Sequence, residues 1–258
     1  MRAILLAAGV GERLRPLTDE APKCLIPVGA RSLLARHLDH FARLPEIDGV
    51  GVVTGYRGEQ VTAAVAAWRD ETGETLPIEL VTNPRFRAGS ILSLAAAGPW
   101  LRASDCVVMD ADVLYGAALL GRLVRSRYAN CFLLDDAAVR TGEEMMVCAN
   151  KRRVLHLARA SEPSTWSGWD QLGEGVGFFR LAASDAPVLL RELDALLAAG
   201  ADEVEYEVAL NAFLPHVVAG FEHVHDLPWT EIDFPGDLKR ATRDILPLLE
   251  RRPAPPTR

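Results

Sequence analysis

The first residues that could do chemistry lie in a turn near the amino terminus. Three small residues, Ala7, Ala8 and Gly9, follow an apolar run, and Gly11 adds a second flexible position. Small side chains let a backbone approach a ligand closely, and the exposed N–H groups of such a turn can bind phosphate oxygens. The turn is therefore a candidate nucleotide site. The alternative is an ordinary glycine-rich turn between a strand and a helix.

Three cations follow this turn. They are Arg13, Arg15 and Lys23. A helix dipole already neutralises part of the charge of a bound pyrophosphate, so three further cations fit the larger charge of a triphosphate better. A dinucleotide-binding turn would need a third glycine where Leu14 stands, and an acid at the end of the second strand, where 54–56 reads Thr-Gly-Tyr. The pattern favours a reacting nucleotide over a nicotinamide cofactor.

Two pairs of acidic residues have a spacing that suits metal ligands. Asp110 and Asp112 follow an apolar run, and Glu231 and Asp233 repeat the spacing far along the chain. Alternate residues of an extended chain point to the same side, and carboxylate oxygens together with phosphates suit Mg²⁺. The alternative is that each pair caps a following helix or turn.

The elements expected in the first half alternate between strands and helices. The strands are expected at Ala3–Leu6, Val50–Thr54, Pro77–Thr82 and Cys106–Met109, and the helices at Ser32–Leu44, Gly58–Trp68 and Ser90–Ala97. Such alternation predicts an α/β fold with a parallel sheet and a site at the carboxyl ends of its strands. Ser32 is expected to cap the first helix.

The second half has a different pattern of elements. Short strands separated by polar turns predict an antiparallel extension of the sheet. They are expected at Cys131–Leu134, Met145–Cys148, Arg153–Leu157 and Val176–Leu181, followed by helices at Ala186–Ala199 and Glu205–Phe213, a strand at Phe221–Asp226 and a closing helix. We expect one domain over residues 1–250, and the proline-rich composition of 251–258 is typical of a disordered tail.

Composition and charge exclude several classes of protein. The net charge of -7 offers no basic surface for nucleic acid, and no apolar stretch is long enough to span a membrane. Four scattered cysteines without metal spacing are typical of reduced thiols, and no signal peptide is recognisable, so we expect a cytoplasmic protein. The six histidines show no ligand spacing, and we assign them no chemistry. The oligomeric state stays open, with a homodimer among the alternatives.

The stretch ILLAAGVGERLRPLTDEAPKCLIPVG strongly resembles the signature of nucleotidyltransferases that activate phosphorylated sugars and alcohols. The resemblance implies a Rossmann-like, GT-A-type fold with a mixed, mainly parallel central sheet flanked by helices. By the same resemblance Ala7, Ala8 and Gly9 line the base and ribose. Gly11 and Arg13 hold the β- and γ-phosphates, and Lys23 reaches the α-phosphate and the acceptor phosphate.

The resemblance also implies a metal site and a mechanism. Asp112 and Asp233 would share one magnesium ion (Mg²⁺), with Asp110 in a supporting role that orients Lys23 or a ribose hydroxyl. An anionic oxygen of the acceptor would attack the α-phosphorus and expel pyrophosphate, so that Lys23 and Arg13 act as catalytic cations and no general base is required.

The segment TNPRFRAGSILSLAAA bears on the choice of nucleotide. It resembles the branch that uses CTP for phosphocholine, 2-aminoethylphosphonate or inositol phosphate, although Gly89 and Ser90 depart from the usual asparagine. Asn83, Gly89 and Ser90 are the expected base contacts, and Ser90 could also cap the helix that follows. The alternative is a sugar-1-phosphate uridylyl-, thymidylyl- or guanylyltransferase. The sugar-phosphate enzymes of the resembling family carry a lysine in an EKP segment, where residues 160–163 here read Ala-Ser-Glu-Pro. By this resemblance, the missing lysine argues against a hexose phosphate acceptor.

A quaternary ammonium acceptor would be bound by aromatic rings with carboxylates nearby. The candidates in the second half are Trp166, Trp169, Tyr206 and Trp229, with Glu205 and Glu207 flanking Tyr206. Tyr206 and Glu207 are the most favoured members. Glu174, with the glycine that follows it, resembles the residues at which the strand on the acceptor side begins in the family. The alternative places these aromatics in the core or in a lid. From another functional class, the chain could be an inactive relative that binds a nucleotide and regulates a partner.

Overall fold

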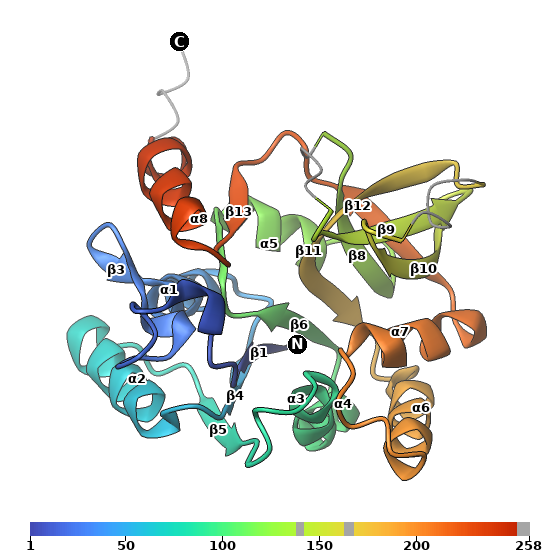
Figure 1. Ribbon diagram of the computed structural model, residues 1–258, viewed down its shortest axis with the longest axis horizontal. Helices are drawn as coiled ribbons and strands as arrows, with labels where there is room; N and C mark the ends of the chain where they lie inside the picture. The colour runs from blue at the N-terminus through green and yellow to red at the C-terminus, as the bar shows by residue number, and fades with distance from the viewer. Residues whose placement is uncertain (138–141, 163–167, 252–258) are drawn as a thin grey trace.

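The computed structural model of the chain describes residues 1–137, 142–162 and 168–251 (Figure 1). A central group of parallel strands carries the architecture. In their order across the sheet they are β6 (Cys106–Asp110), β1 (Arg2–Ala7), β4 (Gly49–Thr54) and β5 (Ile78–Thr82). Every residue of β4 is buried, as expected for a strand covered on both faces.

Helices cover both faces because side chains alternate along each strand. In β1, Leu5 packs into one apolar cluster and Ile4 into another on the opposite face. The Leu5 face is covered by α1 (Leu33–Arg43), α2 (Gly58–Thr72) and α5 (Ala117–Val124). The Ile4 face is covered by α3 (Ile91–Ala96), α4 (Gly98–Ala103), α6 (Ala186–Ala198) and α7 (Glu207–Phe213). The predicted cap of α1 is present, since Ala35 N donates to Ser32 Oγ at 3.2 Å.

The sheet continues beyond β6 as a largely antiparallel extension, at the right of Figure 1. Its strands are β8 (Asn130–Asp135), β9 (Met145–Asn150), β10 (Arg153–Arg159), β11 (Gln171–Leu181) and β12 (Ala219–His223). β11 pairs antiparallel with β6, β8 and β9, whereas β12 runs parallel to β8. The predicted antiparallel extension is confirmed, and β12, whose orientation was not predicted, adds a parallel strand to it.

Two small antiparallel sheets complete the fold. One joins β7 (Val113–Tyr115) to β13 (Trp229–Glu231), and the other joins β2 (Pro27–Val28) to β3 (Arg31–Ser32). The chain then forms α8 (Pro235–Arg240), a π-helical turn (Ala241–Ile245) and α9 (Leu246–Glu250). The β7–β13 pair matters most for function, because it brings a late segment of the chain beside the end of β6.

The predicted elements agree with the structure where the sequence pattern is strong. The main difference in length is β11, which begins at Gln171 rather than Val176. The sequence pattern did not predict α5, β7 or β13. The predicted tail, residues 251–258, lies outside the described residues apart from Arg251. No helix within the described parts of the chain is long and apolar enough to cross a membrane.

Candidate active site

Two adjoining cavities lie at the carboxyl ends of β1 and β6. The larger has a volume of about 440 Å³ and the smaller about 230 Å³. Both are lined by residues from the opening segment, from the start of α3 and from the end of β6: Gly9, Lys23, Ser90, Asp110 and Asp112. The larger cavity also reaches the inner side of β11 and the start of α7. We call the two together the cleft.

Gly11 shapes the turn that opens the cleft. Its φ of 69° is left-handed, and a Cβ there would lie 3.1 Å from both Lys23 Cβ and Thr18 Cγ2. The hydroxyl of Thr18 donates to the Gly11 carbonyl at 2.7 Å and fixes the turn. Glycine is therefore required by backbone conformation and by space, and the turn carries Arg13 to the edge of the cleft.

Lys23 lies between two carboxylates that are distant in sequence. Its Nζ donates to Asp112 Oδ2 at 2.6 Å and to Asp233 Oδ1. Burial by itself lowers the pKa of Lys23, but attraction to these two carboxylates outweighs it and leaves the pKa above its ordinary value. Lys23 is thus a fixed positive charge in the cleft.

Arg13 supplies a second cation, which is more exposed. Its guanidinium donates to Asp233 Oδ2 at 2.5 Å and to Glu143 Oε2 at 2.9 Å, and it lies 4.9 Å from the centre of the Phe234 ring. About half of the side chain is exposed (51%). This position lets Arg13 hold Asp233 in place and still reach an anion that enters from solvent.

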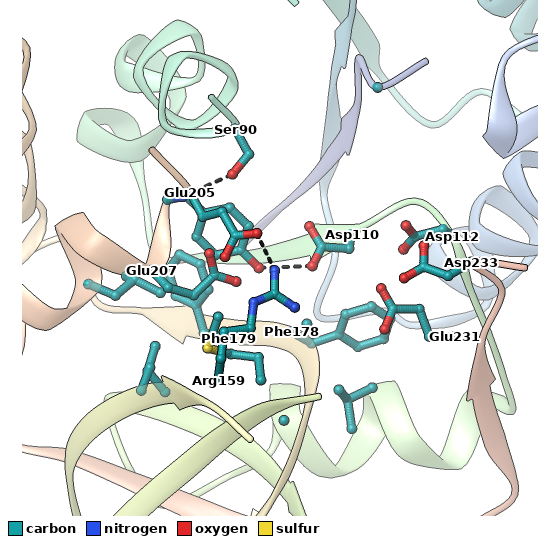
Figure 2. Close-up of a pocket in the computed structure, with 18 of the residues that line it drawn as sticks. Ser90, Asp110, Asp112, Arg159, Phe178, Phe179, Glu205, Glu207, Glu231 and Asp233 are labelled. Carbon is teal, nitrogen blue, oxygen red and sulfur yellow. Dashed lines mark hydrogen bonds and ion pairs between the residues drawn. The ribbon is translucent and has the colours of Figure 1, made fainter. Parts of the chain in front are cut away.

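Asp112, Glu231 and Asp233 form a carboxylate cluster. One oxygen of each lies within 4.8 Å of the others, and Figure 2 shows the three side chains gathered at one end of the cleft. The β7–β13 pair creates the cluster, because Ile232 N donates to Asp112 O at 3.1 Å and Glu231 is paired with Val113. The resemblance assigned no role to Glu231, although its spacing from Asp233 was an available signal.

The cluster has the properties expected of a divalent-metal site. Asp112 Oδ1 is buried and has no hydrogen-bond partner among the described residues. Although part of Glu231 is exposed, burial of its carboxylate, with repulsion from Asp112 and Asp233, raises its pKa to about 8. A divalent cation would satisfy the free oxygen and relieve the repulsion, and carboxylate oxygens are ligands that Mg²⁺ prefers. The residues present therefore fit the predicted ion.

Asp110 lies in the middle of the cleft and has a different partner from the one predicted. Its Oδ2 accepts a hydrogen bond from the Tyr206 hydroxyl at 2.9 Å, and Lys23 does not contact it. Burial, with repulsion from Asp112, raises the pKa of Asp110. A Cβ on Gly177 would lie 2.4 Å from the same oxygen. The prediction that Asp110 orients Lys23 is wrong, and the alternative role at a ribose hydroxyl stays a prediction.

Only some of the predicted nucleotide-binding residues line the smaller cavity. Ala7, Ala8, Gly9 and Ser90 line it together with Asp110. The Ser90 hydroxyl accepts a hydrogen bond from Tyr206 N at 2.9 Å and makes no capping bond to α3, so the capping alternative is corrected.

Asn83 and Gly89 lie outside the lining of both cavities. Asn83 is buried, and its amide donates to Ser93 Oγ at 3.1 Å and accepts from Arg85 N at 2.9 Å. A Cβ on Gly89 would lie 2.0 Å from the carbonyl oxygen of Val204. Asn83 therefore has a structural role through its hydrogen bonds, and Gly89 through its close contact with another segment. These roles explain the two residues without a contact to a nucleobase.

The far end of the larger cavity is aromatic. Three rings of one apolar cluster line it: Phe132, Phe179 and Tyr206. Phe178 also lines the cavity but lies toward Glu231 and the carboxylate cluster (Figure 2). Phe179 stacks on Phe132 with a centroid distance of 5.8 Å and lies 6.2 Å from Tyr206. Of these rings, the sequence analysis named only Tyr206. The phenylalanines were missed because only the pairing of β11 with β6 and β8 brings them to one cavity, and no local pattern reveals that pairing.

Charged side chains border these rings. Figure 2 shows Glu205, Glu207 and Arg159 opposite the carboxylate cluster, with Asp110 between the two groups. Arg159 forms an ion pair with Glu205. Burial raises the pKa of Glu207 to about 7. Arg159 was not among the predicted residues, whereas Glu205 was named as an acid that flanks Tyr206.

The other predicted acceptor residues do not line the cleft. Trp229 donates through Nε1 to Asp135 Oδ2 at 2.8 Å, and Trp169 packs against Met146 and Cys148. Glu174 also lies outside the lining, and burial with repulsion from neighbouring carboxylates raises its pKa to about 7. Trp166 lies outside the described residues.

Residues 3–171 match the family model of the MobA-like NTP transferase domain, and the chain belongs to this family. The structure of CTP:phosphocholine cytidylyltransferase from Streptococcus pneumoniae superposes with a TM-score of 0.73 at 20% identity, over 93% of this chain and 97% of that one. The family match confirms the nucleotidyltransferase resemblance, and the superposition confirms the predicted fold class.

Three curated relatives indicate the range of chemistry in similar proteins. The choline-phosphate cytidylyltransferase of Haemophilus influenzae is 34% identical over 44% of this chain and 45% of the relative. The CMP-5'-(3-aminopropyl)phosphonate synthase of Streptomyces rubellomurinus is 26% identical over 98% of this chain and 40% of the relative. The mannose-1-phosphate guanylyltransferase of Mycobacterium tuberculosis is 29% identical over 98% of this chain and 66% of the relative. The chain spans about half the length of the curated relatives it matches first, at 45%, 55% and 52%.

Proposed function

We propose that this protein transfers a nucleotidyl group from a nucleoside triphosphate, CTP in the favoured case, to a small acceptor that carries a phosphate or phosphonate and an ammonium group. Phosphocholine and 2-aminoethylphosphonate are such acceptors. The observation that carries the proposal is the placement of Lys23 between Asp112 and Asp233, beside the glycine turn that opens the cleft. Family membership supports the nucleotidyl transfer, and the cytidylyltransferase relatives support CTP.

The cleft offers the components of an in-line displacement at phosphorus. An acceptor oxygen forms a bond to the α-phosphorus, the bond from that phosphorus to the β-phosphate bridging oxygen breaks, and pyrophosphate leaves with the electron pair. The acceptor oxygen is already an anion, so its attack needs no base. Lys23 and Arg13 would neutralise and align the two anions, which is the main catalytic problem.

A Mg²⁺ ion held by Asp112 and Asp233, with Glu231 beside them, would supply further neutralisation of phosphate charge when bound. The same carboxylates hold Lys23 and Arg13 in place in the described structure. Both cations are therefore positioned beside the carboxylate cluster, where they would face the phosphates of a bound nucleotide.

The aromatic end of the cleft supports an acceptor with an ammonium group. Phe132, Phe179 and Tyr206 present ring faces or edges to a cavity that Glu205 and Glu207 border. Rings and carboxylates together attract a cation that has been removed from water. This set keeps Tyr206 and Glu207, the favoured members of the predicted cage, and adds Phe132 and Phe179 in place of Trp169 and Trp229.

A sugar-1-phosphate acceptor with another nucleotide is the second candidate, because the mannose-1-phosphate guanylyltransferase relative matches nearly the whole chain. A pyrophosphate-release screen that crosses each nucleoside triphosphate with phosphocholine, 2-aminoethylphosphonate and several hexose 1-phosphates separates the two. We expect release with CTP and an ammonium acceptor. Release with a hexose phosphate alone would establish the second candidate, and saturable nucleotide binding without release from any pair would indicate an inactive regulatory relative.

A further inference from the structure

A second group of metal-ligating side chains lies outside the cleft. Asp136 follows the end of β8, His223 ends β12, and His225 comes two residues later. One ligating atom of each lies within 4.8 Å of the others. None of the three lines either cavity. We call them the histidine cluster.

The parallel pairing of β8 with β12 explains why the three residues meet (Figure 1). Carboxyl ends of parallel strands lie at the same edge of a sheet, and His223 is in register with Leu134. Val224 continues the pairing, since its N–H donates to Leu134 O at 3.0 Å, and its side chain is buried. Side chains alternate along a strand, so His223 points away from the core, and His225 lies in the turn that follows with about half of its side chain exposed (49%).

The two rings face one carboxylate from the same side. His225 Nδ1 lies 2.9 Å from Asp136 Oδ1, and His223 Nδ1 lies 3.4 Å from Asp136 Oδ2. The Nδ1 atom of His223 is buried and has no hydrogen-bond partner in the part of the chain that the structure describes. A buried polar atom without a partner is costly, and here it is aimed at the other two ligands.

We propose that Asp136, His223 and His225 bind a divalent transition-metal ion of the Zn²⁺ type. Imidazole nitrogens and a carboxylate are ligands that Zn²⁺ prefers, at about 2.0 to 2.2 Å. Bonds of that length in a tetrahedral arrangement place ligand atoms about 3.3 Å apart, close to the two separations from Asp136. Three protein ligands leave the fourth position for water. Mg²⁺ prefers oxygen ligands, so the histidine cluster selects a different ion from the cleft.

Arg122 holds the backbone of the histidine cluster in this arrangement. Its guanidinium donates to the carbonyl of His223 at 2.6 Å and forms two bonds to Asp226, at 2.5 and 2.8 Å. The ion pair neutralises Arg122, whose charge would otherwise repel a metal cation. A bound ion would join the ends of β8 and β12 and stabilise the folded state by mass action.

Cobalt provides a direct test, because Co²⁺ occupies Zn²⁺ sites and absorbs visible light when bound. The full chain, freed of metal with a chelator, is titrated with Co²⁺ in excess Mg²⁺, which occupies the carboxylate cluster. We expect saturation at one Co²⁺ per chain and a higher thermal unfolding temperature with Zn²⁺. His223→Gln, His225→Gln and Asp136→Asn should each weaken Co²⁺ binding roughly tenfold or more.

Two variants serve as controls. His216→Gln removes an exposed imidazole elsewhere, and Asp112→Asn removes a carboxylate of the cleft. Both should bind Co²⁺ as the parent chain does. Saturable binding that persists in all three histidine-cluster variants, loss of binding in Asp112→Asn, or no binding by the parent chain would each overturn the proposal. In the last case the carboxylate of Asp136 serves only as an ion-pair partner of the histidines. Pyrophosphate release does not enter this test, so the outcome is independent of the proposed function.

Discussion

Lys23 combines charge, burial and position in a way that no other cation of the opening turn does. Its side chain is only 13% exposed, and it contacts carboxylates that lie 89 and 210 residues further along the chain. Arg15 lies in the same turn but is 56% exposed and pairs with Glu12 and Asp19. The sequence motif alone gives the two cations equal charge, and only the tertiary contacts distinguish their functions.

The first prediction concerns this difference. Lys23→Met should lower kcat/KM for nucleotidyl transfer by roughly a hundred- to a thousandfold, because it removes a fixed charge that acts on the transferring phosphate. The matched control Arg15→Ala should change kcat/KM by less than about threefold, since exposed ion pairs contribute little. The measurement is steady-state pyrophosphate release, with circular dichroism to verify folding. A Lys23→Met variant with the parent rate would show that Lys23 has no part in catalysis.

Among elements, β11 contributes most to the cleft. It pairs with β6, β8 and β9, and its bulge between Gly175 and Phe179 brings two phenylalanines to the cavity. Gly177 lies within the bulge with a φ of 76°. This glycine allows the strand to pass close to the carboxylate of Asp110.

The second prediction tests that close approach. Gly177→Ala should destabilise the fold by about 1 to 2 kcal/mol because alanine disfavours the left-handed backbone conformation of this position. A further loss is expected because the new Cβ would lie 2.4 Å from Asp110 Oδ2. Gly200→Ala is the matched control, with a φ of 83° and no atom within 4 Å of its Cβ. The comparison is made by urea unfolding. Equal losses in the two variants would show that Asp110 imposes no steric requirement on β11.

The third prediction concerns Glu174, on the same strand. Its folded-state pKa of about 7 is above the usual 4.5, so the folded state binds the proton more tightly than the unfolded state does. Its contribution to stability is therefore lost as the pH rises from about 4.5 to 7. Glu174→Gln should raise the free energy of unfolding at about pH 8 by up to about 3 kcal/mol and leave it unchanged near pH 4.

The control for this comparison is Glu74→Gln, an exposed site at which no such difference between the two pH values is expected. Chemical unfolding at both pH values supplies the measurement. A Glu174→Gln variant that is no more stable than the parent chain at about pH 8 would mean that burial does not raise the pKa of Glu174 in the folded state.

Elements differ in how far the sequence could predict them. β1, α1 and the parallel strands follow from local apolar periodicity and from the Ser32 cap, and they were predicted within a few residues. The β7–β13 pair joins segments about a hundred residues apart, with three residues in each strand. Such short strands have no periodicity to detect, and so the position of Glu231 beside Asp112 could not be derived.

At the scale of the whole molecule, the cleft joins the two ends of the chain. Arg13 and Asp233, 220 residues apart, are hydrogen-bonded, and α8 begins two residues after Asp233. The opening motif predicted Gly9, Gly11, Arg13 and Lys23, which line the cleft, because they lie in one short segment. The aromatic end of the cleft is assembled from β8, β11 and the start of α7, and only the packing of the complete sheet brings their rings together.

The central claim is that carboxylates from distant parts of the chain form one phosphoryl-transfer centre with Lys23. The most direct test is the Mg²⁺-dependent rate of pyrophosphate release by Asp112→Asn and Asp233→Asn, with Asp226→Asn, whose carboxylate pairs with Arg122, as the control. We predict that each of the first two substitutions lowers kcat at least about a hundredfold and that the control keeps the parent rate. Parent-like, Mg²⁺-dependent release by either cleft variant would contradict the account.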